Sequence, residues 1–110
     1  MSLVRLLPAL LFATPVLAAT AIGDLVKHPD DYADKTVTIE GTVAPRALAY
    51  RGDALYDLQG SDDYRVTVTG HGAVPAPGTK LSVTGTVRRK PPDEEFDFPP
   101  VVVETSRSTP

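Results

Sequence analysis

Two similar stretches of alternating polar and apolar residues, 44 positions apart, constrain the fold of this chain more than any other feature. One runs from Thr36 to Val43 (TVTIEGTV) and the other from Lys80 to Val87 (KLSVTGTV). Apolar side chains at every second position are typical of a strand with one buried face. In each copy a glycine, Gly41 or Gly85, takes a position of the apolar series. A glycine there indicates a sharp bend or a bulge, so the pair predicts a small closed β-barrel.

Further segments have strand composition, and turn residues separate them. The expected strands cover residues 35–45, 54–58, 64–69, 79–89 and 98–104. Segment 70–78 contains too much Gly and Pro for a regular helix, so we expect it to be an irregular connection that crosses the barrel. Five strands with this connection match the Greek-key barrel of the OB fold, an all-β class.

A short helical lead-in is expected before the first strand, over residues 22–32. Ile22, Leu25 and Val26 lie on one face of this helix, and Pro29 ends it. We expect the lead-in to close one end of the barrel. The domain is then predicted to cover residues 22–105, followed by a flexible polar tail at 106–110.

The N-terminal segment has the pattern of a secretory signal peptide. Arg5 precedes an apolar stretch at 6–17, which is shorter than the roughly 20 residues that cross a bilayer. Small residues follow, so residues 1–18 are predicted to be a signal peptide, with cleavage after Ala18 or after Ala21. These features predict a periplasmic or secreted protein without a permanent membrane anchor.

Composition limits the function classes. The chain has no cysteine, so the fold depends on packing and hydrogen bonds, and a lipid-modified N-terminal cysteine is excluded. Without Arg5, 10 basic side chains stand against 14 acidic ones, a net charge of −4. This balance argues against a surface built entirely for nucleic acid, although it does not exclude a local basic face.

Three parts of the sequence carry a resemblance to a known group of proteins. The lead-in and first strand (22–43), Tyr56 to Leu58, and the segment 77–87 resemble small bacterial exported OB-fold proteins. The resemblance covers nearly the whole mature chain and implies the OB barrel. It implies no particular ligand, because OB barrels serve unrelated tasks.

The sequence offers few groups for catalysis or metal binding. The two histidines, His28 and His71, have no spacing that pairs them with each other or with a nucleophile. The dipeptides at 30–31 and 62–63 are both Asp-Asp, but neither has the alternating oxygen ligands of a calcium loop, and turn formation accounts for both. We therefore predict no catalytic residue, no metal site, no cofactor and no enzymatic activity.

A ligand site is predicted where OB folds usually bind, on strands 2 and 3 and the loops beside them. On this sequence those elements supply cations and one aromatic residue: Arg46, Tyr50, Arg51, Arg65, Arg88, Arg89 and Lys90. Cations follow phosphates and aromatic rings stack on bases in oligonucleotide-binding barrels. Tyr50 is expected to be the exposed ring, because Tyr56 and Tyr64 share the register of the core. Nearby acidic residues repel phosphate, and solvated charged loops explain the same pattern.

Three functions are consistent with these features. The preferred one is a non-enzymatic exported module that binds an envelope protein or a small or anionic ligand through the strand 2–3 face. A second is a binder of single-stranded nucleic acid or oligosaccharide. The third is a structural accessory domain of an envelope complex, joined by strand addition at a sheet edge. The sequence leaves open the ligand, the oligomeric state, the pathway and the cleavage site.

Overall fold

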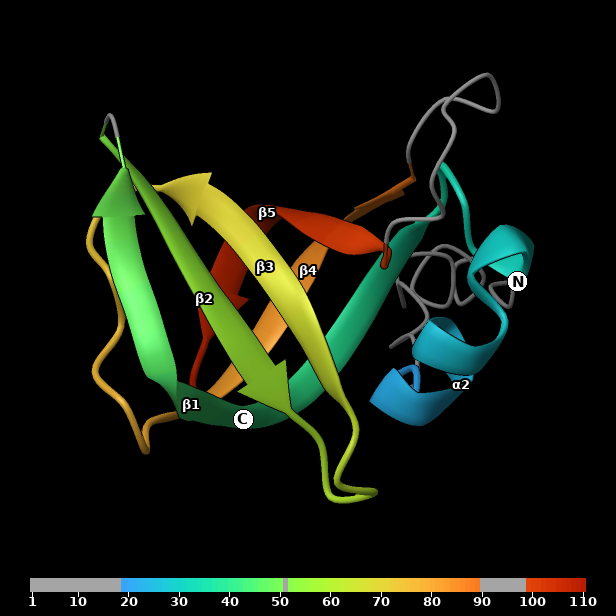
Figure 1. Cartoon of the computed structure of the whole chain (residues 1–110), viewed down its shortest axis with the longest axis horizontal. Coiled ribbons are helices and arrows are strands. Elements are labelled where there is room, and N and C mark those ends of the chain that lie inside the picture. Colours follow the sequence, from blue (N-terminus) through green and yellow to red (C-terminus); the bar gives the residue numbers. More distant parts are fainter. Residues whose placement is uncertain (1–18, 51, 90–98) are drawn as a thin grey trace, which may run out of the picture.

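The computed structural model of the chain describes residues 19–50, 52–89 and 99–110, without the side chains of Ala47, Leu48 and Tyr50. These residues form five strands and a short helical lead-in (Figure 1). The elements are α2 (Ile22–Lys27), η2 (Pro29–Asp31), β1 (Thr36–Tyr50), β2 (Asp53–Gln59), β3 (Arg65–His71), β4 (Lys80–Arg88) and β5 (Val101–Ser108).

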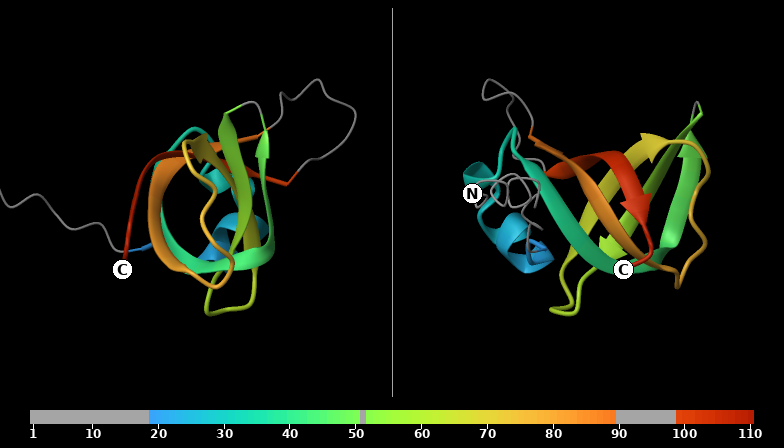
Figure 2. Two further views of the ribbon diagram at one scale, coloured as in Figure 1. Left: turned by 90° about the vertical axis from the view of Figure 1, so that its left-hand side faces the viewer. Right: turned by 180° about the vertical axis from the view of Figure 1, so that it is seen from behind.

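The strands close into a barrel in the order β1-β2-β3-β5-β4. Figure 2 (left) shows them forming a ring. All neighbouring strands are antiparallel except β3 and β5, which run parallel over Thr67–Thr69 and Val101–Val103. The segment from Gly72 to Thr79 between β3 and β4 contains no helix. The structure thus confirms the predicted all-β, five-stranded Greek-key barrel of the OB-fold type.

The two similar stretches of sequence are partners in the barrel. Gly41 of β1 lies opposite Leu81 of β4, and Gly85 of β4 lies opposite Val37 of β1. At Thr42 strand β1 changes from pairing with β4 to pairing with β2, and the β4–β5 register shifts next to Gly85. A Cβ on either glycine would collide with a backbone carbonyl of the adjacent strand. The predicted bend and bulge positions are therefore confirmed.

The core fills the barrel with the inward side chains of all five strands. Residues such as Ile39, Leu58, Val68 and Val83 are fully buried. The lead-in adds Ile22 and Leu25 to the same cluster, with Val26 packed against it. Figure 1 shows α2 beside one end of the barrel. The prediction that the lead-in closes one end is confirmed.

Strand β1 is longer than predicted. It runs to Tyr50 instead of ending at Pro45, so the connection between the first two strands is shorter than the strand ranges 35–45 and 54–58 predict. A register shift between Val43 and Ala47 accommodates the proline, and pairing with β2 then resumes. The reversal is confined to the tip, where Gly52 has a positive φ of 84°.

Strand β5 also differs from its predicted range of 98–104. It begins at Val101, after two prolines that cannot donate to a ladder. It continues to Ser108 because residues 106–108 pair with β4. The strand therefore includes part of the predicted tail.

Several predictions concern residues outside the described part of the chain. The predicted signal peptide at 1–18 lies there, as do Arg51 and Lys90. Removal of the signal peptide thus stays a prediction. Within the described residues, the helices are too short and too polar to span a bilayer.

Candidate functional site

The outer face of β2, β3 and β5 carries a line of mostly apolar side chains across three strands. Leu55 of β2 lies opposite Thr69 of β3, and Thr69 lies opposite Val103 of β5. Alternation turns these residues outward while their neighbours enter the core. Leu55 and Val103 are each 38% exposed, although both are large and apolar. We call Leu55, Thr69 and Val103 the apolar row.

Polar pairs border the apolar row on both sides. On one side, Asp53 and His71 lie opposite each other on β2 and β3, with Oδ1 and Nδ1 2.7 Å apart. On the other side, the Thr67 hydroxyl donates a hydrogen bond of 2.9 Å to Asp57. The second Asp57 oxygen lies 3.5 Å from an Arg46 nitrogen. The face therefore has an uncharged centre and a rim of locally paired polar groups.

Of the four predicted cations whose side chains are described, Arg46, Arg88 and Arg89 each contact a carboxylate. Arg46 pairs with Asp57 as above. Arg88 lies opposite Val101, and its guanidinium is 3.1 Å from Asp34 in the segment between η2 and β1. Arg89 lies 2.7 Å from Asp30 of η2. These ion pairs lower the positive potential that the sequence predicts.

Arg65 differs from the other predicted cations. It lies opposite Gln59 at the start of β3, and its Nε donates a 2.9 Å hydrogen bond to the neutral Gln59 side chain. Tyr50 ends β1, and its side chain is outside the description. Arg51 and Lys90 are not described. The structure thus places Arg46, Arg65, Arg88 and Arg89 without testing whether they bind a ligand.

Tyr64 does not follow the register predicted for it. The residue is 40% exposed because it lies in the turn before β3, where strand alternation has not begun. The Lys27 ammonium of α2 lies 4.9 Å from its ring centroid. The expectation that Tyr64 faces the core is therefore wrong, whereas Tyr56 is buried as predicted.

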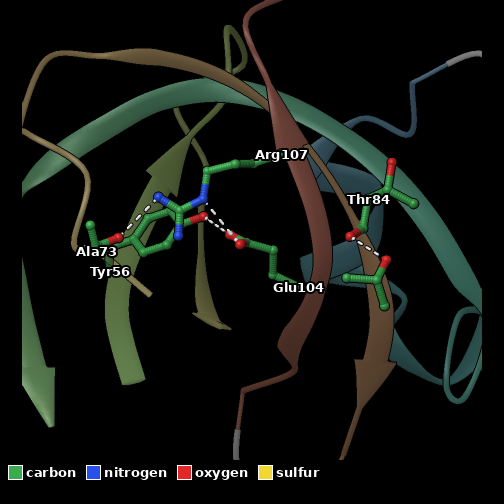
Figure 3. A network of polar contacts seen from close by, with 6 residues as sticks. Tyr56, Ala73, Thr84, Glu104 and Arg107 are labelled. Atoms are coloured by element: carbon green, nitrogen blue, oxygen red, sulfur yellow. Dashed lines mark hydrogen bonds and ion pairs between the residues drawn. The ribbon is translucent and has the colours of Figure 1, made fainter. Parts of the chain in front are cut away.

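A partly buried polar trio at the edge of the core, Tyr56, Glu104 and Arg107, has no counterpart in the sequence predictions. The Tyr56 hydroxyl donates a 2.5 Å hydrogen bond to Glu104, and Arg107 Nε donates one of 3.0 Å to the other carboxylate oxygen. The Arg107 guanidinium also lies 5.5 Å from the Tyr56 ring centroid and donates to the Ala73 carbonyl. Figure 3 shows these side chains converging from β2 and β5.

The trio lies where β3 and β5 stop pairing. Their last paired residues are Thr69 and Val103, and the next ones are Gly70 and Glu104. A Cβ on Gly70 would lie 3.0 Å from the Glu104 side chain, so the glycine provides room for the carboxylate. One sequence signal pointed here: Glu104 falls two residues after the buried Val102, in the inward register.

The role of the trio is to stabilise the fold. Burial raises the pKa of Tyr56 well above its usual value, and the hydrogen bond and negative charge of Glu104 raise it further, while Arg107 partly opposes them. Tyr56 is thus held in its protonated, donating form. A phenol that stays protonated is a poor base or nucleophile. The hydrogen bonds of the trio instead join β2 to β5 and to the connection at Ala73.

Two open hollows lie where β1 bends. Their volumes are about 360 and 340 Å³, and both are lined by Thr42, Gln59 and Gly60. Because Gln59 holds Arg65, the hollows adjoin one end of the outer face. Glu40 and Lys80 supply charge to the smaller hollow only. The residues that the two hollows share offer neutral hydrogen-bonding groups.

The comparisons with known proteins define the fold alone. No protein-family model matches the sequence, and a search of curated proteins gives no match. Among solved structures, an aspartyl tRNA synthetase from Entamoeba histolytica is similar, with a TM-score of 0.64 and 19% identity over 84% of this chain. A protein described as an aspartyl-tRNA synthetase from Leishmania major Friedlin has a TM-score of 0.65 and 16% identity over 88%. The chain corresponds to 21% of each of these two proteins.

A third similar structure is of comparable size. It is the OBody AM3L09 bound to hen egg-white lysozyme, with a TM-score of 0.62 and 12% identity. The match covers 86% of this chain and 94% of the OBody. These likenesses support the OB-fold assignment.

Proposed function

We propose that this chain is an exported, non-enzymatic binding module that holds a partner protein of the cell envelope on the outer face of β2, β3 and β5. The observation that carries the proposal is the apolar row, whose Leu55 and Val103 lie exposed in register on a three-stranded surface. Export rests on the signal-peptide pattern of residues 1–18.

The composition of the face suits a protein partner. Protein interfaces combine an apolar centre that loses its water with a polar rim that stays solvated. Here Leu55 and Val103 form the centre, and the Asp53–His71 and Asp57–Arg46 pairs form the rim. The similar OBody, whose structure is described as bound to lysozyme, supports the use of such a barrel for protein binding.

The charge arrangement disfavours a polyanionic ligand. A phosphate that bound Arg46, Arg88 or Arg89 would compete with the carboxylate that each already contacts. Asp57 and Asp53 would also repel it from the face. Strand addition is disfavoured too, because each strand has neighbours on both sides of the ring along part of its length.

A single-stranded nucleic acid is the second candidate, on one specific observation. Among the described residues, the Arg65 side chain donates a hydrogen bond to the neutral Gln59 and to no carboxylate. Arg65 also directly follows Tyr64 in the sequence, and Tyr64 is exposed. An aromatic ring beside a cation is the combination that binds single strands. Two of the similar structures are aspartyl-tRNA synthetases, which makes this candidate worth a direct test.

Affinity capture with matched variants tests the proposal. The exported protein is tagged and crosslinked in cells as wild type, as Leu55→Asp and as Ser82→Asp, a substitution at a half-buried position on β4. We expect one envelope protein to be retained by the wild type and Ser82→Asp and lost with Leu55→Asp, because a carboxylate in the apolar centre stays unpaired. Retention by folded Leu55→Asp would contradict the proposed face.

A titration with a fluorescent single-stranded oligonucleotide separates the second candidate. Binding to phosphates weakens steeply as salt rises, and each lost phosphate contact lowers the slope by about one unit. We expect no such binding at physiological salt. Tight binding that weakens with salt and is reduced in Arg65→Ala would replace the protein-binding proposal by the nucleic-acid one.

A further inference from the structure

The residues that directly precede α2 already belong to the folded barrel. The backbone N–H of Thr20 donates a 2.7 Å hydrogen bond to the Thr38 carbonyl of β1. The carbonyl of Ala21 accepts from the N–H groups of Asp24 and Leu25, at 3.1 and 3.2 Å. Ala21 is thus the N-cap residue of α2, and its carbonyl begins the helical ladder.

The next residue, Ile22, is a poor place for a chain terminus. It is only 2% exposed and belongs to the core cluster. Its Cβ lies 3.3 Å from the position that a Cβ on Gly60 would take. A chain that began at Ile22 would keep this side chain in the core but would lack the Ala21 carbonyl that begins the helical ladder and the bond from Thr20 to β1.

The nearest carboxylate shown at this point is already engaged. One oxygen of Asp62 accepts the Gly23 N–H at 2.8 Å, and the other accepts the Tyr64 N–H at 3.2 Å. These contacts hold α2 to the β2–β3 turn, so the helix depends on the Ala21 carbonyl at its first turn and on Asp62 together. By contrast, Ala19 is exposed, and a charged terminus there stays in water.

We propose that the signal peptide is removed after Ala18, so that the mature protein begins at Ala19 and Ala19 to Ala21 form part of its fold. Hydrolysis of the Ala18–Ala19 peptide bond consumes one water and leaves a carboxylate on Ala18 and an ammonium on Ala19. The inference rests on the export in the proposed function. It opposes the simplest sequence choice, since Ala19-Thr20-Ala21 fits the small-x-small pattern better than Val16-Leu17-Ala18.

The full chain, expressed in a bacterium and recovered from the extracytoplasmic fraction, tests the inference by intact mass. We expect a product that begins at Ala19. A product that begins at Ile22 would overturn the inference and leave export standing. A product that retains Met1 would overturn export as well, so the two failures are distinguishable.

Two full-length variants make the test sharper. Ala18→Gln places a large side chain before the proposed bond, and Ala21→Gln places the same side chain before the alternative bond, at an exposed position of the fold. We expect normal processing of Ala21→Gln. We expect Ala18→Gln to accumulate as precursor, or to yield a chain from Ile22 whose thermal midpoint is lower by at least about 4 °C. Blocked processing of Ala21→Gln alone, or an Ile22 product as stable as the wild type, would overturn the inference.

Discussion

The hydroxyl of Tyr56 donates a hydrogen bond to the carboxylate of Glu104, 48 residues away in the sequence. This contact joins β2 to β5 across the point where β3 and β5 separate. Arg107 completes it by holding the second carboxylate oxygen and the carbonyl of Ala73. The barrel is therefore closed at this point by side chains in place of a backbone ladder.

Replacing Tyr56 by Phe is expected to lower the free energy of unfolding by about 1.5–3 kcal/mol, the usual contribution of a hydrogen bond to a charged group. The ring still fills the core, so the change reports the hydroxyl. Chemical denaturation at neutral pH measures it. Tyr64→Phe serves as a control because Tyr64 is an exposed residue. Equal losses in both variants would contradict a special role for Tyr56.

The same side chain gives the stability a dependence on alkaline pH. The pKa of Tyr56 is raised in the folded state, mainly by burial. Its stabilising contribution is therefore complete below the ordinary tyrosine pKa of about 10 and is lost as pH rises above that value. Denaturation midpoints measured from pH 8 to 11.5 should fall more steeply for the wild type than for Tyr56→Phe. Parallel curves would show that the phenol does not contribute to this dependence.

Glu104 and Arg107 are expected to be energetically coupled. Their side chains are 8% and 24% exposed, so the loss of one charge leaves the other poorly hydrated. A double-mutant cycle with Glu104→Gln and Arg107→Met should give a coupling of about 1–2 kcal/mol, below the effect of breaking a fully buried pair.

The exposed pair of Arg88 and Asp34 is the matched control for this cycle. These side chains are 62% and 78% exposed, so water screens their attraction. Arg88→Met with Asp34→Asn should give a coupling below about 0.5 kcal/mol. A coupling at the surface pair as large as that within the trio would contradict the role of burial.

Gly41 and Gly85 are expected to tolerate no side chain. A Cβ on Gly41 would lie 2.5 Å from the carbonyl oxygen of Gln59, and one on Gly85 would meet the Val103 carbonyl. Backbone atoms cannot move aside easily. Gly41→Val and Gly85→Val should therefore each lower the free energy of unfolding by at least about 1 kcal/mol. Thermal unfolding measures the cost. The control is Thr86→Val, which should change stability by less than about 0.5 kcal/mol; unchanged midpoints in both glycine variants would contradict this account.

The sequence predicts the barrel well because strand alternation and the two glycines are local signals. It predicts strand ends poorly. Pro45 suggests a stop, yet a register shift in the pairing with β2 accommodates it, and β5 is extended by its partner β4. The Tyr56–Glu104 contact depends on both registers at once, so local reasoning missed it. The ion pairs of Arg88 and Arg89 likewise depend on where the lead-in docks.

Asp62 is expected to stabilise the lead-in from across the barrel end. Ala21, the N-cap residue of α2, makes no side-chain capping bond. The Asp62 carboxylate takes the place of a side-chain cap by accepting a hydrogen bond of 2.8 Å from the Gly23 N–H. Its negative charge also suits the positive end of the helix. Asp62→Ala should therefore cost about 1 kcal/mol, as the loss of an N-cap does.

Hydrogen exchange distinguishes this capping role from a general charge effect. In Asp62→Ala, the amide protons of α2 should exchange faster relative to those of β2, since the helix loses its link to the β2–β3 turn. Asp31→Ala, which removes an exposed carboxylate of η2, should leave α2 unchanged. If Asp31→Ala accelerated exchange in α2 as much as Asp62→Ala did, the total charge of the lead-in region would account for the effect, and the specific contact to Gly23 would not.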